Sequence, residues 1–391
     1  MTTRMDNGEH NHNEYKSGLE GVVAAETRLS HVDGQRGELF IAGFPVDVLA
    51  TRAGYEETAY LLWHGELPTS EQLHTFREAL ASRRELPSIT LALLREAAVR
   101  EIGAMDALRM AAGTLNLAAG DEPGLDLVAR FPTMVAAYAR LREGEEPVAP
   151  RADLGQAANY LTMLRGTPPT RVQARSLERY LITVSDHGLN ASTFAARTII
   201  STDSDLVSAV VGAIGALKGP KHGGAPGPAL DTVLAIGHPE IAEPHLRAKL
   251  ERGERLMGFG HRVYKVRDPR AEVLAAAAER LYTSGNAIRG DMELYRLAKA
   301  VEETAVALLE EYKPGRNLQT NVEFYTALLL HGLGLDADLF SPTFAIGRLP
   351  GWIGHCLEQQ REGRLIRPQS HYTGERGREW MPLEARSRAE A

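Results

Sequence analysis

Residues 204–219, SDLVSAVVGAIGALKG, carry apolar or small side chains at nearly every position. A helix that is apolar on almost all of its faces is surrounded by other parts of the protein. The segment that follows, 219–228 (GPKHGGAPGP), is rich in glycine and proline and ends the helix. The sequence therefore predicts a helical protein whose core encloses one of its own helices.

The composition agrees with a helical fold. Hydrophobic residues make up 43% of the 391 residues, aromatic residues only 6%, and alanine and leucine are abundant. The length exceeds that of one minimal domain and predicts two lobes, or a large domain with an insert. We predict an all-α fold, and a minor β-hairpin at 27–46 (TRLSHVDGQRGELFIAGFPV), where Asp33-Gly34 is a turn signal between alternating runs.

Charge and cysteine usage exclude several classes. The net charge is −7 with no block of one sign, so nothing predicts binding to nucleic acid or membranes. No segment reaches the roughly 18–20 unbroken apolar residues of a membrane span, and the N-terminus has no apolar signal-peptide stretch. Cys356 is the single cysteine, which rules out an internal disulfide and fits a reducing compartment. We expect a soluble cytoplasmic protein.

Helical spacing recurs from residue 49 onward and predicts two lobes. Residues 1–17 are polar and are predicted to be a disordered tail, in which His10 and His12 are better explained as solvated side chains than as metal ligands. A more charged group of helices over 224–330 is predicted to form a small lobe. The large lobe comprises 18–223 and 331–391, where 342–363 returns as a long buried helix.

Two histidines lie in glycine-rich loops between helices. His222 stands in GPKHGGAPG and His261 in GFGHRVYKVRDPR. Glycine lets backbone approach a ligand closely, and a histidine held there can present a ring nitrogen to a substrate carbonyl. The structural alternative is that the glycines only mark helix ends.

A lone carboxylate, Glu323, begins the apolar run TNVEFYTALLL at 320–330. It is a candidate proton acceptor. The local alternative is a capping box in which Glu323 folds back onto Thr320.

Other catalytic patterns are not satisfied. The loop at 219–228 lacks the spacing of a P-loop, and no G-x-G-x-x-G follows a strand. In VSDH at 184–187 the Ser, Asp and His are adjacent along the chain and cannot face one another as a hydrolase triad. No Cys/His cluster has metal-ligand spacing.

At these residues the chain resembles the citrate synthases, in the short form found in bacteria and archaea. The strongest mark is 258–270, GFGHRVYKVRDPR, and the resemblance runs from about residue 19 to 383. Six further stretches support it: GLEGVVAAETRLSHVDG, LLWHGELPT, SDHGLNAST, GPKHGGAPG, NVEFYTALLL and RLIRPQSHYTG.

The resemblance implies the condensation of an acyl-CoA with a 2-oxo acid, without a metal or a cofactor other than these substrates. It implies that Glu323 takes a proton from the thioester methyl while His222 donates a hydrogen bond to the thioester oxygen. It implies that His261 polarises and protonates the keto oxygen of oxaloacetate. His187, Arg270 and Arg348 would bind oxaloacetate, with Arg367 supplied by the other subunit of a homodimer. For each arginine the alternative is structural, as a helix cap or a surface side chain.

The resemblance also implies a CoA site and closure of the small lobe over the large one. Basic residues would hold the CoA phosphates, although an ordinary solvated basic loop is the alternative. The positions that match the CoA site are Arg255, Leu256, Met257, Gly258, Phe259, Gly260, Lys313 and Arg316.

Three positions depart from the family pattern. Glu323 stands where the family has Asp, and its extra methylene moves the carboxylate by about 1 Å, which can cost on the order of 100-fold in rate. Gly188 replaces a usual Glu, and 41–43 (Ile-Ala-Gly) replaces Tyr-Arg-Gly.

Three functions follow from the resemblance and this departure. The first is a citrate-forming synthase that uses acetyl-CoA. The second is a 2-methylcitrate synthase that uses propionyl-CoA, because pocket volume decides between acyl chains. The third is a weakly active paralogue that binds CoA or oxaloacetate.

Overall fold

The computed structural model of the protein describes residues 15–118, 122–222 and 226–386. Contacts divide the chain into two units, Thr27–Leu365 and the two terminal segments, and each is described by itself. The predicted tail lies outside the described residues up to position 14, as do His10 and His12. The division into lobes at 224–330 stays a prediction.

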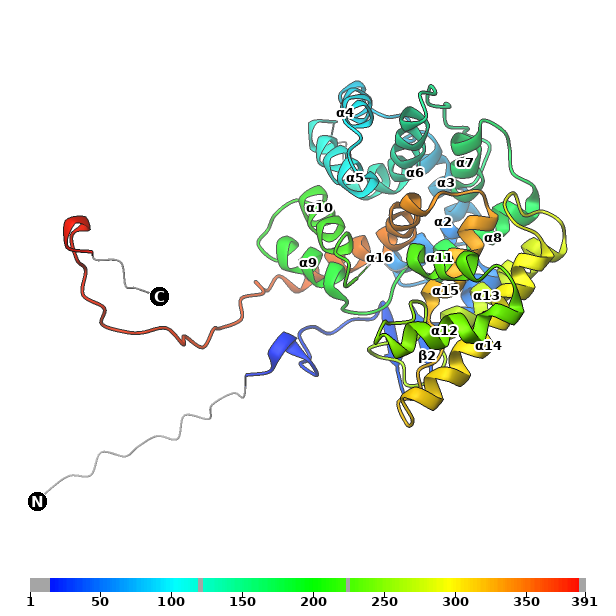
Figure 1. The fold of residues 1–391 in the computed structure, drawn as a ribbon. Helices are drawn as coiled ribbons and strands as arrows, with labels where there is room; N and C mark the ends of the chain where they lie inside the picture. The colour runs from blue at the N-terminus through cyan, green and yellow to red at the C-terminus, as the bar shows by residue number, and fades with distance from the viewer. Residues whose placement is uncertain (1–14, 119–121, 223–225, 387–391) are drawn as a thin grey trace, which may run out of the picture. The chain divides into compact units, whose positions relative to one another are not determined.

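The fold is largely helical, as predicted, and Figure 1 shows the course of its helices. The α-helices are α1 Val46–Arg52, α2 Tyr55–His64, α3 Ser70–Ala81, α4 Ser88–Val99, α5 Ala104–Gly113, α6 Pro123–Arg142, α7 Gln156–Arg165, α8 Arg171–Thr183, α9 Ala191–Ile200, α10 Leu206–Leu217, α11 Pro226–Ile236, α12 Ala242–Glu251, α13 Pro269–Thr283, α14 Met292–Tyr312, α15 Val322–Gly332 and α16 Phe340–Glu362. Short 3₁₀ turns lie at Ser17–Leu19, Thr114–Ala118, Pro239–Ile241, Ala337–Leu339 and Leu383–Ala385.

Helix ends follow the signals in the sequence. Thr69 and Thr170 each cap a helix by accepting the backbone N–H of a glutamine three residues on, and both form capping boxes. Gly65 ends α2 in the left-handed conformation, which glycine adopts without strain.

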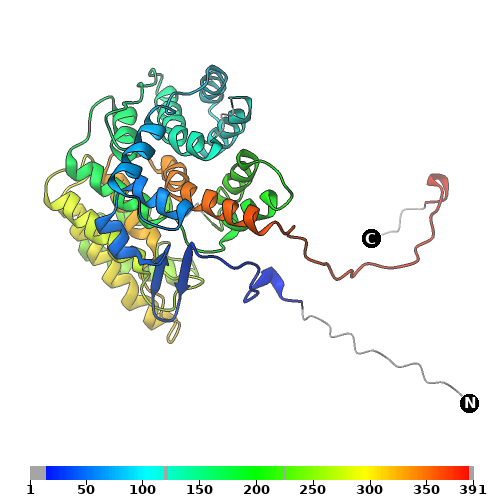
Figure 2. The same cartoon turned by 180° about the vertical axis from the view of Figure 1, so that it is seen from behind.

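The predicted hairpin is present and is joined by a third strand. β1 Ser30–Asp33 pairs antiparallel with β2 Glu38–Ile41, and β2 pairs with β3 Phe44–Pro45 (Figure 2). The Asp33 carboxylate accepts the backbone N–H groups of Gln35 and Arg36, which closes the β1–β2 turn.

Helix α16 forms the centre of the core. It packs against α2, α6, α8, α9 and α10, and its Trp352 is fully buried. Gly351 allows this packing, because a Cβ there would lie 2.1 Å from the carbonyl oxygen of Ser185. The prediction for 342–363 as a buried helix is therefore confirmed.

Helix α10 is less enclosed than the sequence predicts. Its side that carries Leu206, Val210 and Ile214 is buried against α9 and α16. Gly215 on the other side is exposed. The small residues on that side provide too little side-chain surface to require complete burial, which explains the difference.

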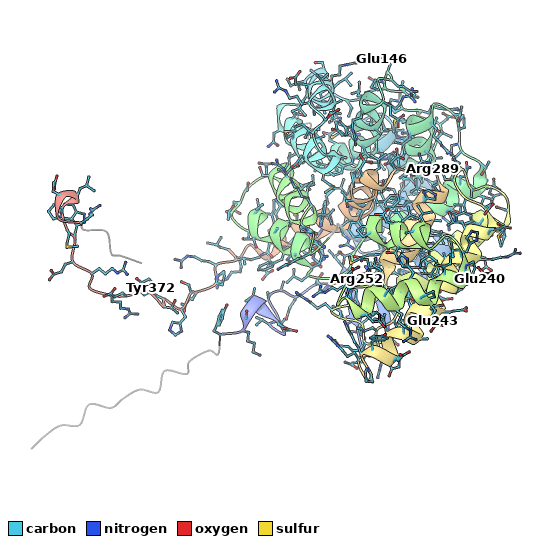
Figure 3. The ribbon with its side chains drawn as sticks, in the orientation of Figure 1. Glu146, Glu240, Glu243, Arg252, Arg289 and Tyr372 are labelled. Carbon is cyan, nitrogen blue, oxygen red and sulfur yellow. The ribbon has the colours of Figure 1, made fainter. Side chains whose placement is uncertain are left out.

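A second group of helices forms around α13 and α15. These two pack closely together, α11 packs on α15, and α12 packs on α14. Glu243 in α12 and Arg252 at its end lie exposed on the outside of this group (Figure 3). Within the described residues no helix is long and apolar enough to cross a membrane.

Candidate active site

Two of the predicted histidines lie together with a tyrosine. His187 follows α8, and His261 lies in the segment between α12 and α13. Their ring centres are 5.7 Å apart, and Tyr264 lies 4.9 Å from His261. The Tyr264 hydroxyl is 3.0 Å from Nε2 of His187. Residues that are 74 positions apart thus form one cluster.

The hydrogen bonds of His261 determine which ring nitrogen can donate. Nδ1 accepts the backbone N–H groups of Val263 and Tyr264, each at 3.1 Å. Burial and the Arg270 cation lower the pKa of His261 to about 4, so the ring is neutral at pH 7. A neutral ring that accepts at Nδ1 carries its proton on Nε2. His261 therefore carries its proton on Nε2. This nitrogen lies 3.4 Å from Nη2 of Arg270, which is also a donor, so a ligand oxygen beside them would accept from both.

His222 is held in the opposite tautomer by the start of α9. Its Nε2 accepts the backbone N–H of Ser192 at 3.3 Å and lies 2.8 Å from the Ser192 hydroxyl. Burial and the Arg348 cation lower the pKa of His222 to about 4. The neutral ring must then carry its proton on Nδ1, which leaves that N–H available to a ligand.

Ser192 is itself fixed by two partners. Asn190, the N-cap of α9, places its side-chain oxygen 2.8 Å from the Ser192 hydroxyl. The Nε1–H of Trp352 donates to the same hydroxyl at 3.1 Å. Ser192 and Asn190 stand in SDHGLNAST, yet their spacing alone gave them no role.

Arg270 and Asp268 form a buried ion pair beside His261. The Asp268 carboxylate accepts from Nε and Nη2 of Arg270 at 3.0 and 2.7 Å, and from the Arg270 backbone N–H at 3.0 Å. The same carboxylate accepts the backbone N–H of Val322 at 3.3 Å, in the first turn of α15. Asp268 therefore ties Arg270 to the helix that carries Glu323.

Arg348 is a buried cation of a different kind. It lies in α16, is 1% exposed and donates from Nε to the backbone oxygen of Val184. No carboxylate lies within ion-pair distance of Arg348 among the described residues. Burial lowers its pKa to about 10, so it stays charged at pH 7. A buried cation of this kind favours an anionic ligand.

Glu323 faces the same charges. Burial and the nearby Asp268 carboxylate raise its pKa to about 7, although the Arg270 cation opposes this rise. The N-cap of α15 is Asn321, whose side-chain oxygen accepts the Glu323 backbone N–H at 3.0 Å. The capping-box alternative at Thr320 is therefore wrong, because the neighbouring asparagine performs the capping.

A short antiparallel bridge connects His261 with Glu323. Gly260 donates its N–H to the oxygen of Gln319 at 2.7 Å, and the Asn321 N–H donates to the oxygen of Gly258 at 3.0 Å. Gly258 and Gly260 have φ of +90° and +79°, and a Cβ on either would lie 3.1 Å from a side chain of the facing segment. The glycines of the GFGH stretch are thus needed for this close approach.

A buried polar chain supports His187 from behind. Asp186 lies 3.2 Å from Nε2 of the fully buried His355, and Nδ1 of His355 lies 3.1 Å from Nη1 of Arg197. Arg197 continues to Glu358 at 3.0 Å. Burial alone would raise the pKa of Asp186, but His355 and Arg348 lower it, so Asp186 is ionised.

Gly188 explains one departure from the family pattern. It has a φ of +60°, and its N–H donates to the hydroxyl of Ser30 at 2.6 Å. A glutamate would be strained in this conformation. The other departure lies at 41–43. There Ala42 and Gly43 form the tight turn between β2 and β3.

The remaining predicted positions are less tightly arranged. Arg255 and Arg316 are exposed and Lys313 is half-buried, and none of the three has an ion pair in the described part of the chain. Leu256 is buried, and the Phe259 ring lies 5.3 Å from the Phe324 ring. Met257 is half-buried. Arg367 belongs to the terminal unit and is not placed against the histidines.

Comparison with known proteins gives the family. A sequence model described as "Citrate synthase, C-terminal domain" matches residues 18–369. The chain belongs to the citrate synthase family. The resemblance in the sequence is thereby confirmed.

Similar proteins carry two related names. The chain is 42% identical to a citrate synthase of Haloferax volcanii, over 95% of this chain and 99% of that one. It is 40% identical to citrate synthase 2 of Bacillus subtilis, with the same coverage. It is also 38% identical to a 2-methylcitrate synthase of Mycobacterium tuberculosis, over 92% of this chain and 90% of that one.

Solved structures of citrate synthases share the fold. The structure from Thermotoga maritima matches with a TM-score of 0.84 at 36% identity, over 96% of this chain and all of that one. The Thermoplasma acidophilum citrate synthase, in a ternary complex with carboxymethyl coenzyme A and oxaloacetate, matches with a TM-score of 0.87 at 28% identity, over 95% of this chain and all of that one.

Proposed function

We propose that this protein condenses acetyl-CoA with oxaloacetate and hydrolyses the resulting citryl-CoA to citrate and CoA. The observation that carries the proposal is the ionisation pattern of the site. Neutral histidines with defined N–H donors and a carboxylate with a pKa of about 7 lie in the field of Arg270 and Arg348. This pattern suits removal of a proton from a weak carbon acid, followed by attack on a polarised carbonyl.

In the first step Glu323 accepts a proton from the methyl group of acetyl-CoA. A carboxylate with a pKa of about 7 is a stronger base than an ordinary one and is largely ionised just above neutral pH. The Nδ1–H of His222 donates to the thioester oxygen, on which the enolate charge develops. Ser192 supports this step because its backbone N–H keeps the donor proton on the correct nitrogen of His222.

In the second step the enolate carbon attacks the keto carbon of oxaloacetate. The Nε2–H of His261 donates a hydrogen bond to the keto oxygen and transfers its proton as the alkoxide forms, and the ring regains a proton from solvent, which restores neutral His261. The buried guanidinium of Arg348, which lacks a carboxylate partner among the described residues, and that of Arg270 bind the two oxaloacetate carboxylates. Water then hydrolyses the thioester. Closure of the predicted lobes would exclude bulk water during these steps.

Two further parts of the proposal concern partners. Arg255, Leu256, Met257, Gly258, Phe259 and Gly260, with Lys313 and Arg316, are proposed to hold CoA. Arg367 is proposed to bind oxaloacetate from the other subunit of a homodimer. The proposal assigns no step to a metal or a resident cofactor. We further propose a cytoplasmic location, which the single buried Cys356 suits.

A thiol-release assay tests the proposal. Purified protein is supplied with oxaloacetate and either acetyl-CoA or propionyl-CoA, and free CoA is followed with a thiol reagent. We expect a higher kcat/KM with acetyl-CoA. A higher kcat/KM with propionyl-CoA would instead establish a 2-methylcitrate synthase, which the similarity to the Mycobacterium tuberculosis protein favours as the second candidate. If neither acyl-CoA is turned over, both enzyme functions are refuted, and the remaining function is that of a paralogue that binds CoA or oxaloacetate.

A further inference from the structure

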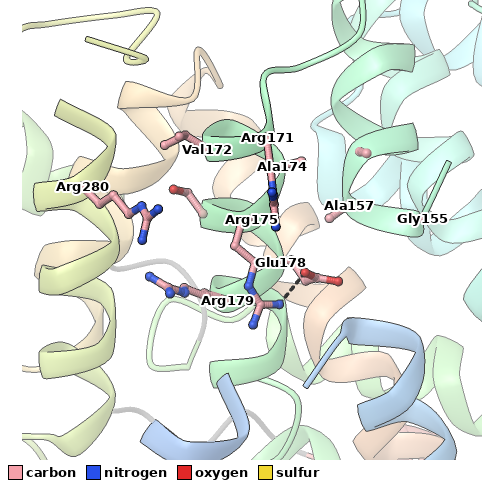
Figure 4. Close-up of a pocket in the computed structure, with 11 residues that line it drawn as sticks. Gly155, Ala157, Arg171, Val172, Ala174, Arg175, Glu178, Arg179 and Arg280 are labelled. Atoms are coloured by element: carbon pink, nitrogen blue, oxygen red, sulfur yellow. Dashed lines mark hydrogen bonds and ion pairs between the residues drawn. The ribbon is translucent and has the colours of Figure 1, made fainter. Parts of the chain in front are cut away.

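A hollow of about 660 Å³ lies where α8 faces α7 and α13, and none of the clustered histidines lines it. Four arginines line it: Arg171, Arg175 and Arg179 from α8, and Arg280 from α13 (Figure 4). Because the three on α8 are spaced four residues apart, they lie on one face of that helix. The single carboxylate in the lining is Glu178, and the other lining residues are a serine, a valine, a glycine and alanines.

One arginine of the four is already neutralised. Arg175 donates to the Glu178 carboxylate and to the backbone oxygens of Ala53 and Thr51. The other oxygen of Glu178 accepts the backbone N–H of Tyr55 at 3.1 Å. This pair therefore serves to join α8 to the α1–α2 connection and leaves no carboxylate for the other arginines.

The other three arginines have no ion pair within the described residues. Nε of Arg179 is shielded from solvent and has no hydrogen-bond partner. The side chains of Arg179 and Arg280 extend toward one another across the space between α8 and α13 (Figure 4). Burial lowers the pKa of Arg179, and the cations of Arg175 and Arg280 lower it further. The unpaired Nε–H of Arg179, placed between two other cations, is unfavourable unless an anion binds there and accepts from it.

We propose that this hollow is a binding site for a small anion that carries two or more phosphate groups. Arg179 and Arg280 bind the phosphates from the two helices, and Arg171 binds at the rim. Guanidinium groups suit this ligand because their planar N–H pairs match phosphate oxygens. No aromatic ring is among the lining residues, so the site recognises the phosphates and not a stacked base.

The bound anion would connect two helices that reach the active site. α8 leads into Val184 and His187, while α13 has Arg270 in its first turn and carries Arg280 ten residues further on. An anion between Arg179 and Arg280 holds these helices together. We therefore expect it to change the turnover rate, and this part of the inference rests on the proposed function.

Isothermal titration of the full-length protein with inorganic tripolyphosphate, at fixed ionic strength, tests the binding. We expect the affinity to fall at least about tenfold in Arg179→Gln and in Arg280→Gln, because each loses a charge-assisted hydrogen bond. The matched control is Arg296→Gln, an exposed arginine of α14 outside the hollow, which removes the same charge and should bind like wild type. Circular dichroism confirms that each variant is folded.

The outcomes are distinct. No binding to wild type, or equal affinities in Arg179→Gln, Arg280→Gln and Arg296→Gln, overturns the proposal. The kinetic assay is then run with and without tripolyphosphate, and the rate should respond in wild type and Arg296→Gln but not in Arg179→Gln. A protein that binds the anion as described but turns over neither acyl-CoA would refute the proposed function and leave this site in place.

Discussion

Replacing Asp268 by asparagine tests how the site is held together. The Asp268 carboxylate is fully buried, pairs with a guanidinium that is 4% exposed, and also accepts two backbone N–H groups, from Arg270 and Val322. Asn keeps the shape but turns an NH₂ group or a neutral oxygen toward Arg270. Breaking a buried pair by removing one charge costs about 3–5 kcal/mol, because the other charge stays buried and uncompensated. We expect Asp268→Asn to lose stability of that order.

The chain offers a matched control in Arg151 and Asp153. This pair has the same spacing of two residues and is also held by two hydrogen bonds, but its side chains are 46% and 61% exposed. Asp153→Asn should leave stability unchanged, because solvent screens an exposed pair. Chemical denaturation of both variants, followed by circular dichroism at one protein concentration, gives the comparison. Equal transitions for the two variants would refute the structural role of Asp268.

The same variant has a second effect on the pH profile. The Asp268 carboxylate raises the pKa of Glu323, while the Arg270 cation lowers it. In Asp268→Asn the carboxylate charge that raises the pKa of Glu323 is gone, and the Arg270 cation that lowers it is no longer neutralised. Both changes lower the pKa of Glu323. The acid limb of kcat/KM should therefore move to lower pH in Asp268→Asn. A shift to higher pH would contradict the placement of Glu323 in this field.

Four other predictions concern the site and the core. The acid limb of wild-type activity should lie at about pH 7, because the proposed base Glu323 accepts a proton only when it is ionised. Burial raises the folded-state pKa of Glu323, so ionising it destabilises the wild-type fold as pH rises. In pH-dependent denaturation, Glu323→Gln should therefore become more stable than wild type by about 1–3 kcal/mol between about pH 4.5 and pH 7, and equal to it below that range. Gly351→Ala should unfold at a lower denaturant concentration or fail to accumulate, because its Cβ would lie 2.1 Å from a backbone oxygen. Gly103→Ala is the control and should behave like wild type, because no atom lies within 4 Å of its Cβ. Arg367→Ala should raise the KM for oxaloacetate at least about tenfold. Mixed dimers of Arg367→Ala and His261→Ala subunits should regain some activity, because one of their sites combines an intact His261 with an intact Arg367 from the other subunit. No recovery is expected if Arg367 acts within its own subunit.

The sequence predicts what depends on local signals. Helices began and ended at their capping threonines and glycines because these residues act on the nearest backbone groups. The hairpin followed from its turn residues. His261 and Arg270 stand in one short stretch of sequence, and the structure places them 3.4 Å apart.

Features that depend on distant pairing were missed. Nothing around Ser192 indicates that its backbone N–H meets a histidine thirty residues later. The contact of Asp186 with His355 joins positions 169 apart, and the bond from Asp268 to the start of α15 exists only once α13 has packed beside it. Likewise, the unpaired charges of Arg179 and Arg280 become evident only when α8 and α13 face each other.

The bridge between 258–260 and 319–321 has a consequence for the order of folding. It closes a loop of 61 residues, from Gly260 to Asn321, and a flexible chain of that length would lose about 3–4 kcal/mol of entropy on closure. Helices α13 and α14 lie within this loop and shorten it as they form, so the bridge closes after them. The segments that carry His261 and Glu323, the proposed proton donor and proposed base, are therefore expected to come together late in folding. We expect recovery of turnover after dilution from denaturant to lag behind recovery of helix content.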